Sequence, residues 1–256
     1  MCTLIALHRC IDGAPLVVAA NRDEFFERPA EGPALRETAG GWIVAPRDLR
    51  AGGTWLGLNA RGVFAALTNR RVAEPDPQRR SRGLLVLDAL GAANAAQAAD
   101  ALEELPRDAY NAFNLLVADA HSAHVVSYDG EPERIDLAAG AHVIGNAHPG
   151  DRTGKLERLR EDARRAGAAP AEAVLDRLAQ VCRSHDGDGE LDRACVHAGP
   201  YGTRSSTLLR VGSDAGDVLH YADGAPCERA YRDFTPLLVE LDRGREHGRT
   251  DVRNIR

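Results

Sequence analysis

Apolar runs separated by turn residues divide this chain into groups of strands and helices. A buried strand over residues 2–8 and its hairpin partner over residues 15–20 flank a turn at Asp12-Gly13. A loop rich in Gly, Pro and Glu is expected to end near residue 41. Further on, the pair Gly52-Gly53 predicts a tight turn with positive φ or a close approach of two backbones. The other strands expected before residue 70 are residues 42–45, 57–59 and 62–69.

Helical periodicity appears in two separate regions, and strands follow each of them. The first region predicts a helix over residues 83–91 and a second from Asn94 to near residue 106, opened by the capping-box pair Asn94 and Gln97. The second region predicts a helix that buries Leu156 and Leu159 and another opened by Pro170. The strands expected after residue 106 are residues 113–117, 124–128, 134–137, 142–146, 205–211, 218–221 and 227–231.

The order of strands, helices, strands, helices and strands predicts an α+β fold rather than alternating βα units. Short turns between successive strands favour antiparallel sheets. Two sheets, each covered by a pair of helices, would bury both helix pairs and both sheets. Because no repeat or linker divides the chain, we expect a single domain over residues 1–242 and a polar, arginine-rich tail over residues 243–256.

Composition and charge exclude several function classes. A formal net charge of −6 argues against nucleic-acid binding, since phosphate contacts require a surplus of basic groups. Five widely spaced cysteines do not resemble a disulfide framework, and no secretory n-region precedes the opening apolar run. No apolar stretch approaches the about 20 residues that span a bilayer. We therefore expect a cytoplasmic chain without a nucleic-acid partner or transmembrane segment; its oligomeric state stays open.

The second residue offers nucleophilic chemistry. Methionine aminopeptidases remove Met1 readily when the next side chain is small, and this would make Cys2 the N-terminal residue. One residue would then carry a thiol of reference pKa about 8.5 and an α-amine of about 7.7–8. An amine near neutral pH can accept the proton of the thiol, as in N-terminal-nucleophile hydrolases. The alternative is that Cys2 is a small buried hydrophobe.

A polar cluster follows the second expected strand directly. If residues 2–8 and 15–20 pair antiparallel, the cluster Asn21-Arg22-Asp23-Glu24 lies close to Cys2. Asp23 then has two interpretations. It is a helix cap or turn residue, which is the common role of Asp after a strand, or it holds the N-terminal amine in place.

The segment over residues 70–82 is a proline-containing loop with several arginines. Its arginines are candidates to rim the pocket and meet a phosphate-bearing substrate such as an acyl-CoA, with Arg79 and Arg80 as the pair to test. These arginines are Arg70, Arg71, Arg79, Arg80 and Arg82. The alternative is an ordinary solvated loop. Trp55 and Phe64 are candidates to line an acyl pocket, although Phe64 lies inside a strand, where core packing is expected.

Four residues are candidates for a metal site: Cys182, His185, Cys195 and His197. Their Cys-x-x-His and Cys-x-His spacing offers four zinc-type donors. However, Cys182 continues the apolar face of a helix, and the spacing matches no recognised zinc motif. We therefore expect no metal and no cofactor.

Several segments of the chain resemble the NRDE family, which includes proteins of the transport and Golgi organization protein 2 type. The resemblance rests on MCTLIAL, ANRDEFFERP, AGGTWLGLNARGVFAALTNRR and SRG within residues 1–83, and on FNLLVAD, VIGN and YGTRSSTLL further on. It implies the Ntn-hydrolase fold, an α-β-β-α four-layer sandwich, in agreement with the order of elements. A more distant similarity to bile-salt hydrolases and penicillin V acylases implies roles for individual residues.

In that similarity, Cys2 is the nucleophile and its freed amine the general base, while Asp23 orients the amine. Asn69 and Asn146 fall where those amidases place asparagines that stabilise the oxyanion, and Arg204 matches an arginine near the nucleophile. Each of these three residues also has a purely structural alternative. Asn69 would end a strand, Asn146 would cap a turn, and Arg204 would pair with a surface carboxylate. Those amidases carry an arginine three residues before the aspartate, whereas this chain has Ala20 there and Arg22 adjacent to Asp23, so Arg22 is a substrate-binding candidate.

Two functions from different classes result. The first is a cysteine Ntn hydrolase that cleaves an amide or thioester acyl bond through an acylated Cys2. The second, implied by the resemblance, is a binding or trafficking protein for acyl-CoA, lipid or haem that keeps the fold and pocket. Both expect a small-molecule acyl ligand, and fold alone does not choose between them.

Overall fold

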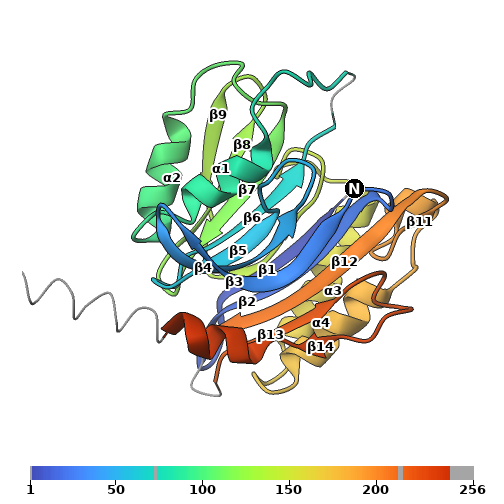
Figure 1. Cartoon of the computed structure of the whole chain (residues 1–256). Helices are drawn as coiled ribbons and strands as arrows, with labels where there is room; N and C mark the ends of the chain where they lie inside the picture. The colour runs from blue at the N-terminus through green and yellow to red at the C-terminus, as the bar shows by residue number, and fades with distance from the viewer. Residues whose placement is uncertain (1, 72–73, 213–215, 243–256) are drawn as a thin grey trace, which may run out of the picture.

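The computed structural model describes residues 2–71, 74–212 and 216–242. It confirms an α+β fold with two antiparallel sheets (Figure 1). Met1 and the polar tail expected over residues 243–256 lie outside the described residues. Within them, no helix has both the length and the apolar character that crossing a bilayer requires.

The first sheet has the strand order β10-β1-β2-β12-β13-β14, with β11 paired to β12. Its strands are β1 (Thr3–Ile11), β2 (Ala14–Phe25), β10 (Gly140–Ile144), β11 (His197–Ala198), β12 (Tyr201–Val211), β13 (Val218–Ala222) and β14 (Arg232–Asp233). The second sheet runs in sequence order from β3 to β9. Its strands are β3 (Ala30–Thr38), β4 (Gly41–Asp48), β5 (Leu56–Asn59), β6 (Phe64–Asn69), β7 (Phe113–Ala118), β8 (Ala123–Tyr128) and β9 (Pro132–Asp136).

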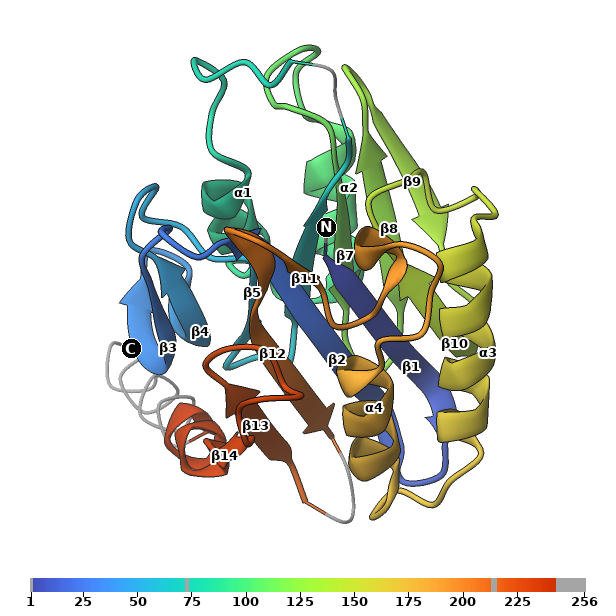
Figure 2. The ribbon, with the colours of Figure 1, turned by 90° about the vertical axis from the view of Figure 1, so that its right-hand side faces the viewer.

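Helices cover the outer face of each sheet, which produces four layers (Figures 1 and 2). The second sheet is covered by α1 (Arg82–Ala89) and α2 (Ala95–Glu103), and the first by α3 (Gly154–Gly167) and α4 (Val174–Arg183). The Asn94 side chain caps α2 by accepting a hydrogen bond from the Gln97 N–H, as the capping-box pattern predicted. The helix expected from residue 170 begins only at Val174. A short 3-10 helix, η1 (Glu190–Asp192), lies in the segment after α4.

Strands that are apolar on both faces explain this layering. In β1, Leu4 and Ala6 face the core between the sheets, whereas Ile5 and Leu7 face the core beneath α3 and α4. Successive strand side chains point to opposite faces, so one continuous apolar run fills two cores. Phe64 is fully buried between the sheets, which confirms core packing for this side chain.

The Gly52-Gly53 turn shows both features predicted for it, a positive φ at one glycine and a close approach of two backbones at the other. Gly52 has a φ of +76°, in the left-handed region. A Cβ on Gly53 would lie 2.2 Å from the carbonyl carbon of Gly83. The Thr54 N–H donates to the Gly83 carbonyl at 3.1 Å, which joins this turn to the start of α1. The close approach fixes where α1 begins, beside the pocket that Cys2 lines.

Two expectations from the sequence are wrong, and one of the two interpretations of Asp23 is excluded. The segment expected as a loop before residue 41 contains strand β3. Residues 227–231 form no strand, since the backbone turns there through hydrogen bonds from Glu228 and Arg229 to the Ala225 carbonyl. β2 continues through Phe25, so Asp23 lies inside a strand and is not a helix cap or turn residue. The sequence also did not predict the helix over residues 235–242.

Candidate functional site

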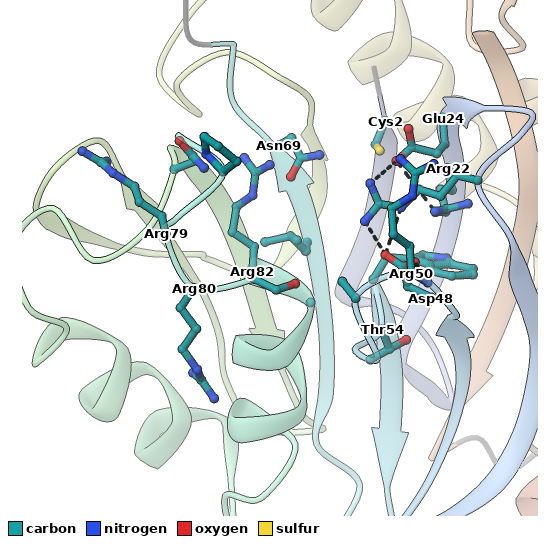
Figure 3. Close-up of a pocket in the computed structure, with 18 of the residues that line it drawn as sticks. Cys2, Arg22, Glu24, Asp48, Arg50, Thr54, Asn69, Arg79, Arg80 and Arg82 are labelled. Carbon is teal, nitrogen blue, oxygen red and sulfur yellow. Dashed lines mark hydrogen bonds and ion pairs between the residues drawn. The ribbon is translucent and has the colours of Figure 1, made fainter. Parts of the chain in front are cut away.

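A polar pocket of about 390 Å³ opens where β1 begins and β6 ends (Figure 3). Five of the nine residues singled out from the sequence line it together: Cys2, Arg22, Asp23, Trp55 and Asn69. Two more of the nine, Arg79 and Arg80, line its far side.

Strand register places Cys2 against the polar cluster. Thr3 pairs with Asn21 across β1 and β2, and one step further along this antiparallel pair Cys2 lies opposite Arg22. The Cys2 Sγ lies 4.0 Å from the backbone carbonyl oxygen of Asp23, to which the thiol donates. Burial raises the pKa of the Cys2 thiol above its ordinary value, and the positive charge of Arg22 opposes this effect. The predicted proximity of Cys2 and the cluster is therefore observed.

Asp23 is buried and held by neighbouring strands. Its Oδ1 accepts a hydrogen bond of 2.7 Å from the Thr203 hydroxyl, and its backbone carbonyl accepts one of 3.0 Å from the Tyr201 hydroxyl. Burial raises the pKa of Asp23 to about 6, against the opposing charge of Lys155. Lys155 extends from α3, is itself buried, and donates to the Leu191 carbonyl at 3.3 Å. A carboxyl group that titrates near neutral pH therefore lies beside the start of β1.

Arg22 is fixed by an aromatic ring and by a chain of ion pairs. Its guanidinium carbon lies 4.2 Å from the centre of the Trp55 ring, and Nη2 lies 3.7 Å from Glu24. Glu24 also pairs with Arg28 at 3.6 Å, and Arg28 donates two hydrogen bonds to Asp48. Burial alone would raise the pKa of Asp48, but the Arg28 guanidinium holds it below its ordinary value. This network keeps a positive charge next to the thiol.

The two asparagines differ in position. Asn69, at the end of β6, extends toward Cys2 across the pocket (Figure 3). Asn146 does not line the pocket; its side-chain amide donates to the backbone carbonyl of Asn69. Asn146 thus links the segment after β10 to the end of β6. Its position supports Asn69 from outside the pocket wall.

The structure does not bring Arg204 to Cys2. The register of β2 with β12 shifts between Thr203 and Ser205, which leaves Arg204 in a β-bulge. Its guanidinium donates to Asp223 at 2.7 Å, and it lines neither of the two cavities that include Cys2. Arg22, from the other strand, occupies the position beside the thiol instead.

The two loop arginines expected to meet phosphate are engaged elsewhere. Arg79 donates to the Tyr110 carbonyl and pairs with Asp108 at 3.5 Å, and Arg80 pairs with Asp88 and the Tyr110 hydroxyl. In Figure 3 both side chains extend away from Cys2. They belong to the pocket rim, but their charges are already neutralised by partners.

Sequence reasoning missed two pocket cations as site residues: Arg28 and Arg50. Arg82, one of the loop arginines expected at the pocket, does line it; burial lowers its pKa, and it donates to the Ala112 carbonyl at 2.9 Å. The motif ERP, which contains Arg28, was the available signal for that residue. The lining includes six arginines and four carboxylates. These are Arg22, Arg28, Arg50, Arg79, Arg80 and Arg82 with Asp23, Glu24, Asp48 and Asp76. The pocket therefore favours an anionic ligand.

The four candidate metal ligands named from the sequence do not all come together, because Cys182 lies apart from the other three. Cys182 is buried in the core beneath α3 and α4, and its backbone carbonyl accepts a hydrogen bond from the Asn21 side chain. Its three proposed partners do gather, with Cys227 in place of Cys182. That group does not line the pocket of Cys2.

Comparison with known proteins relates this arrangement to two groups. Over residues 1–221 the chain matches the family model of Transport and Golgi organisation 2. It is 31% identical over 234 residues to the human Transport and Golgi organization protein 2 homolog, covering 78% of this chain and 83% of the human protein. The mouse homolog is 29% identical over 231 residues, with 77% and 82% covered.

Among solved structures, the chain is similar to a Caenorhabditis elegans ortholog of N-acylethanolamine-hydrolyzing acid amidase. The TM-score is 0.59 at 13% identity, with 83% of this chain and 94% of that chain covered. A mutant of the conjugated bile acid hydrolase from Clostridium perfringens aligns with a TM-score of 0.50 at 14% identity and 94% coverage of both chains. The chain belongs to the Transport and Golgi organisation 2 family and has the fold of the Ntn hydrolases.

Proposed function

We propose that this protein is an Ntn-type cysteine hydrolase that cleaves an amide or thioester acyl bond through an acylated Cys2. The observation that carries the proposal is the position of Cys2 at the head of β1. There it lines a polar pocket with Arg22 beside it, Asp23 on the neighbouring strand and Asn69 across the opening.

The reaction begins once Met1 has been removed, which frees the α-amine of Cys2. The amine accepts the thiol proton as Sγ bonds to the acyl carbon, and Asp23 orients the amine. The Asn69 amide, which has no hydrogen bond among the described residues, and the Arg22 charge stabilise the negative oxygen that develops. The bond to the leaving group then breaks, and the amine returns the proton to it. Water attacks the thioester, releases the carboxylic acid and restores the thiol.

The charge of the pocket supports an anionic substrate. Arg22 is buried and Arg82 is half-buried on the pocket wall, whereas Arg79 and Arg80 are paired with carboxylates on the rim. Arginine binds phosphate and carboxylate groups with two parallel hydrogen bonds. We therefore place the anionic group of an acyl compound, such as an acyl-CoA phosphate, against Arg22 and Arg82. Of the loop arginines proposed for this role from the sequence, this keeps Arg82 and drops Arg79 and Arg80.

A second candidate is a binding or trafficking protein for acyl-CoA, lipid or haem that performs no hydrolysis. The observation that favours it is the environment of the thiol. Burial raises the pKa of Cys2, which reduces the thiolate fraction at neutral pH. In this function, the arginines hold the anionic ligand and Cys2 remains unmodified.

Two measurements separate these functions. The intact mass of the purified chain tests whether Met1 is absent, as the hydrolase requires. The protein is then incubated with a panel of acyl amides and acyl-CoAs, and the N-terminal peptide is analysed by mass spectrometry. We expect an acyl adduct on Cys2 that is absent from Cys2→Ala.

The exposed thiol of Cys10 supplies the matched control, and Cys10→Ser should retain the adduct. Retention of Met1, or tight ligand binding without any adduct or released acid across the panel, would reject hydrolysis in favour of the binding function.

A further inference from the structure

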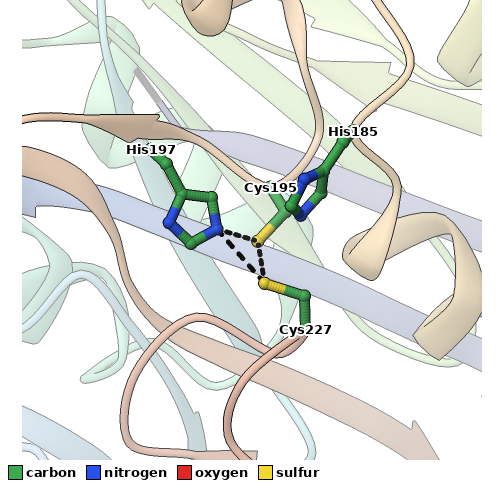
Figure 4. Close-up of side chains that lie close together, drawn as sticks. All are labelled: His185, Cys195, His197 and Cys227. Carbon is green, nitrogen blue, oxygen red and sulfur yellow. Dashed lines mark hydrogen bonds between the residues drawn. The ribbon is translucent and has the colours of Figure 1, made fainter.

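Four side chains from three separate segments converge beside β11 (Figure 4). His185 follows α4, Cys195 and His197 lie at the entry to β11, and Cys227 lies in the turn after β13. Each contributes one donor atom, and all four donor atoms lie within 4.8 Å of one another. We propose that His185, Cys195, His197 and Cys227 bind one zinc ion in a structural site.

The distances between donor atoms fit tetrahedral coordination. Zinc–sulfur bonds of about 2.3 Å and zinc–nitrogen bonds of about 2.0–2.1 Å give edges of roughly 3.8 Å between sulfurs and roughly 3.6 Å between sulfur and nitrogen. The two sulfurs are 3.5 Å apart. His197 Nε2 lies 3.7 Å from the Cys195 Sγ and 3.2 Å from the Cys227 Sγ. One ion therefore fits between them with only small adjustments of the side chains.

The donor set selects zinc and a structural role. Two thiolates with two imidazoles are a common structural zinc set, and four protein ligands leave no open position for a substrate. The second nitrogen of His197, Nδ1, lies 3.8 Å from a Glu228 carboxylate oxygen. A carboxylate on the far nitrogen of a ligating histidine fixes the orientation of the ring. The His197 ring already presents Nε2 to the two sulfurs and turns Nδ1 toward Glu228.

The site would join the segment after α4, the entry to β11 and the turn after β13. The Cys195 N–H donates to the Ser184 carbonyl, which already places the ligands at residues 185 and 195 side by side. The Val196 N–H donates to the Thr203 hydroxyl at 2.9 Å, and that hydroxyl donates to Asp23. A bound ion would therefore stabilise the segment that supports Asp23, while remaining outside the pocket itself.

Metal content of the whole chain tests the proposal directly. The protein is purified under reducing conditions without chelator, and zinc is quantified by mass spectrometry alongside protein concentration. We expect about one zinc per chain. Cys227→Ser and His185→Asn alter exposed residues, so the fold should survive in both. Loss of a residue that only hydrogen-bonds to a zinc ligand lowers metal affinity by about 10–100-fold. Each of these two substitutions removes a ligand itself, so each should lower zinc affinity by more than that. Cys10→Ser should bind zinc as the wild type does.

Cobalt substitution provides a second readout that does not depend on activity. The wild-type Co²⁺ protein should show intense tetrahedral d–d bands and a thiolate charge-transfer band, both lost in Cys227→Ser. Zinc and cobalt uptake unchanged by the ligand substitutions would overturn the proposal. So would the absence of uptake by reduced, folded protein, or a Cys195–Cys227 disulfide that persists under reducing purification. Hydrolase activity enters none of these outcomes.

Discussion

The Thr203 hydroxyl donates a 2.7 Å hydrogen bond to the buried carboxylate of Asp23 and accepts a 2.9 Å bond from the Val196 N–H. This single side chain therefore links β2, β12 and the segment that leads into β11. A hydroxyl can donate once and accept from others, which suits this position between a carboxylate and a backbone N–H. The position of Asp23 depends on elements nearly 180 residues later in the chain.

Replacing Asp23 by asparagine should stabilise the protein in a pH-dependent way. The folded-state pKa of Asp23 is raised to about 6, so the folded protein binds its proton more tightly than the unfolded chain does. Stability is therefore lost as pH rises from about 4 to about 6, and Asp23→Asn removes that loss. We expect a gain of at most about 3 kcal/mol at pH 8 that disappears near pH 4, measured by denaturant unfolding across pH.

The exposed carboxylate of Asp223 gives the comparison for this experiment. Asp223→Asn removes only an ion pair with Arg204 at the surface and should not increase stability at pH 8. A gain in Asp23→Asn that is equal at pH 4 and pH 8 would contradict a buried, proton-sensitive carboxyl.

Replacing Arg22 should make the Cys2 thiol less acidic. Arg22 is the arginine whose charge lowers the thiol pKa against the effect of burial. We expect Arg22→Gln to slow iodoacetamide alkylation of Cys2 at pH 7.5 by roughly threefold to tenfold, equivalent to a shift of about half to one pH unit. Peptide mapping by mass spectrometry gives the rate at Cys2 alone.

Two further variants identify the cause. Arg22→Lys keeps the charge and should restore most of the rate. Arg204→Gln should leave it unchanged, because Arg204 pairs with Asp223 and does not line the pocket. An equal effect of Arg22→Gln and Arg204→Gln would refute the assignment of Arg22 as the arginine beside the thiol.

Lys155, the only lysine of the chain, should control the titration of Asp23. Its buried ammonium favours the charged form of the carboxyl. Lys155→Met should therefore raise the pKa of Asp23 above about 6 by roughly one pH unit. Carboxyl-carbon NMR, with the Asp23 resonance assigned from Asp23→Asn, measures this. Lys155→Arg should stay close to the wild type, and an unchanged titration in Lys155→Met would exclude the electrostatic coupling.

Adding a methyl group at Gly53 should disturb the pocket through the start of α1. The new Cβ would overlap the backbone of Gly83, which cannot move without moving α1 and Arg82. We expect Gly53→Ala to cost about 1–3 kcal/mol, equivalent to a drop in Tm of roughly 2–10 °C for a domain of this size. Gly154→Ala, where a Cβ meets only the end of Arg158 at 3.8 Å, should leave Tm the same or higher. Equal Tm values for the two variants would show that the close approach is not required.

The sequence predicted the elements whose signal is local. The apolar runs of β1 and β2 on either side of the Asp12-Gly13 turn predicted their antiparallel pairing, and this pairing places Cys2 next to the cluster at residues 21–24. β3 was missed because it is an edge strand with a half-exposed, polar composition and a proline, Pro33, at a register shift. An edge strand needs few apolar residues, so its sequence resembles a loop.

The sequence predicted the side of the site that the β1–β2 pair defines, and the family resemblance predicted Asn69 across from it. A β-bulge moved Arg204 away from the thiol, and nothing local in the sequence indicates which residue a bulge will displace. The spacing of Cys182 and His185 suggested metal ligands, yet the fold gathers Cys227, from a different element, in place of Cys182. Long-range contacts decided both outcomes.

The sequence by itself determined the family, the layered α+β fold and the nucleophile candidate, because motifs, apolar runs and a cysteine at position 2 are properties of the chain in order. Only the tertiary structure decided which charges reach that thiol, how Asp23 is buried and which four side chains meet beside β11. These depend on sheet register and on contacts between segments far apart in the chain, which local patterns of residues do not specify.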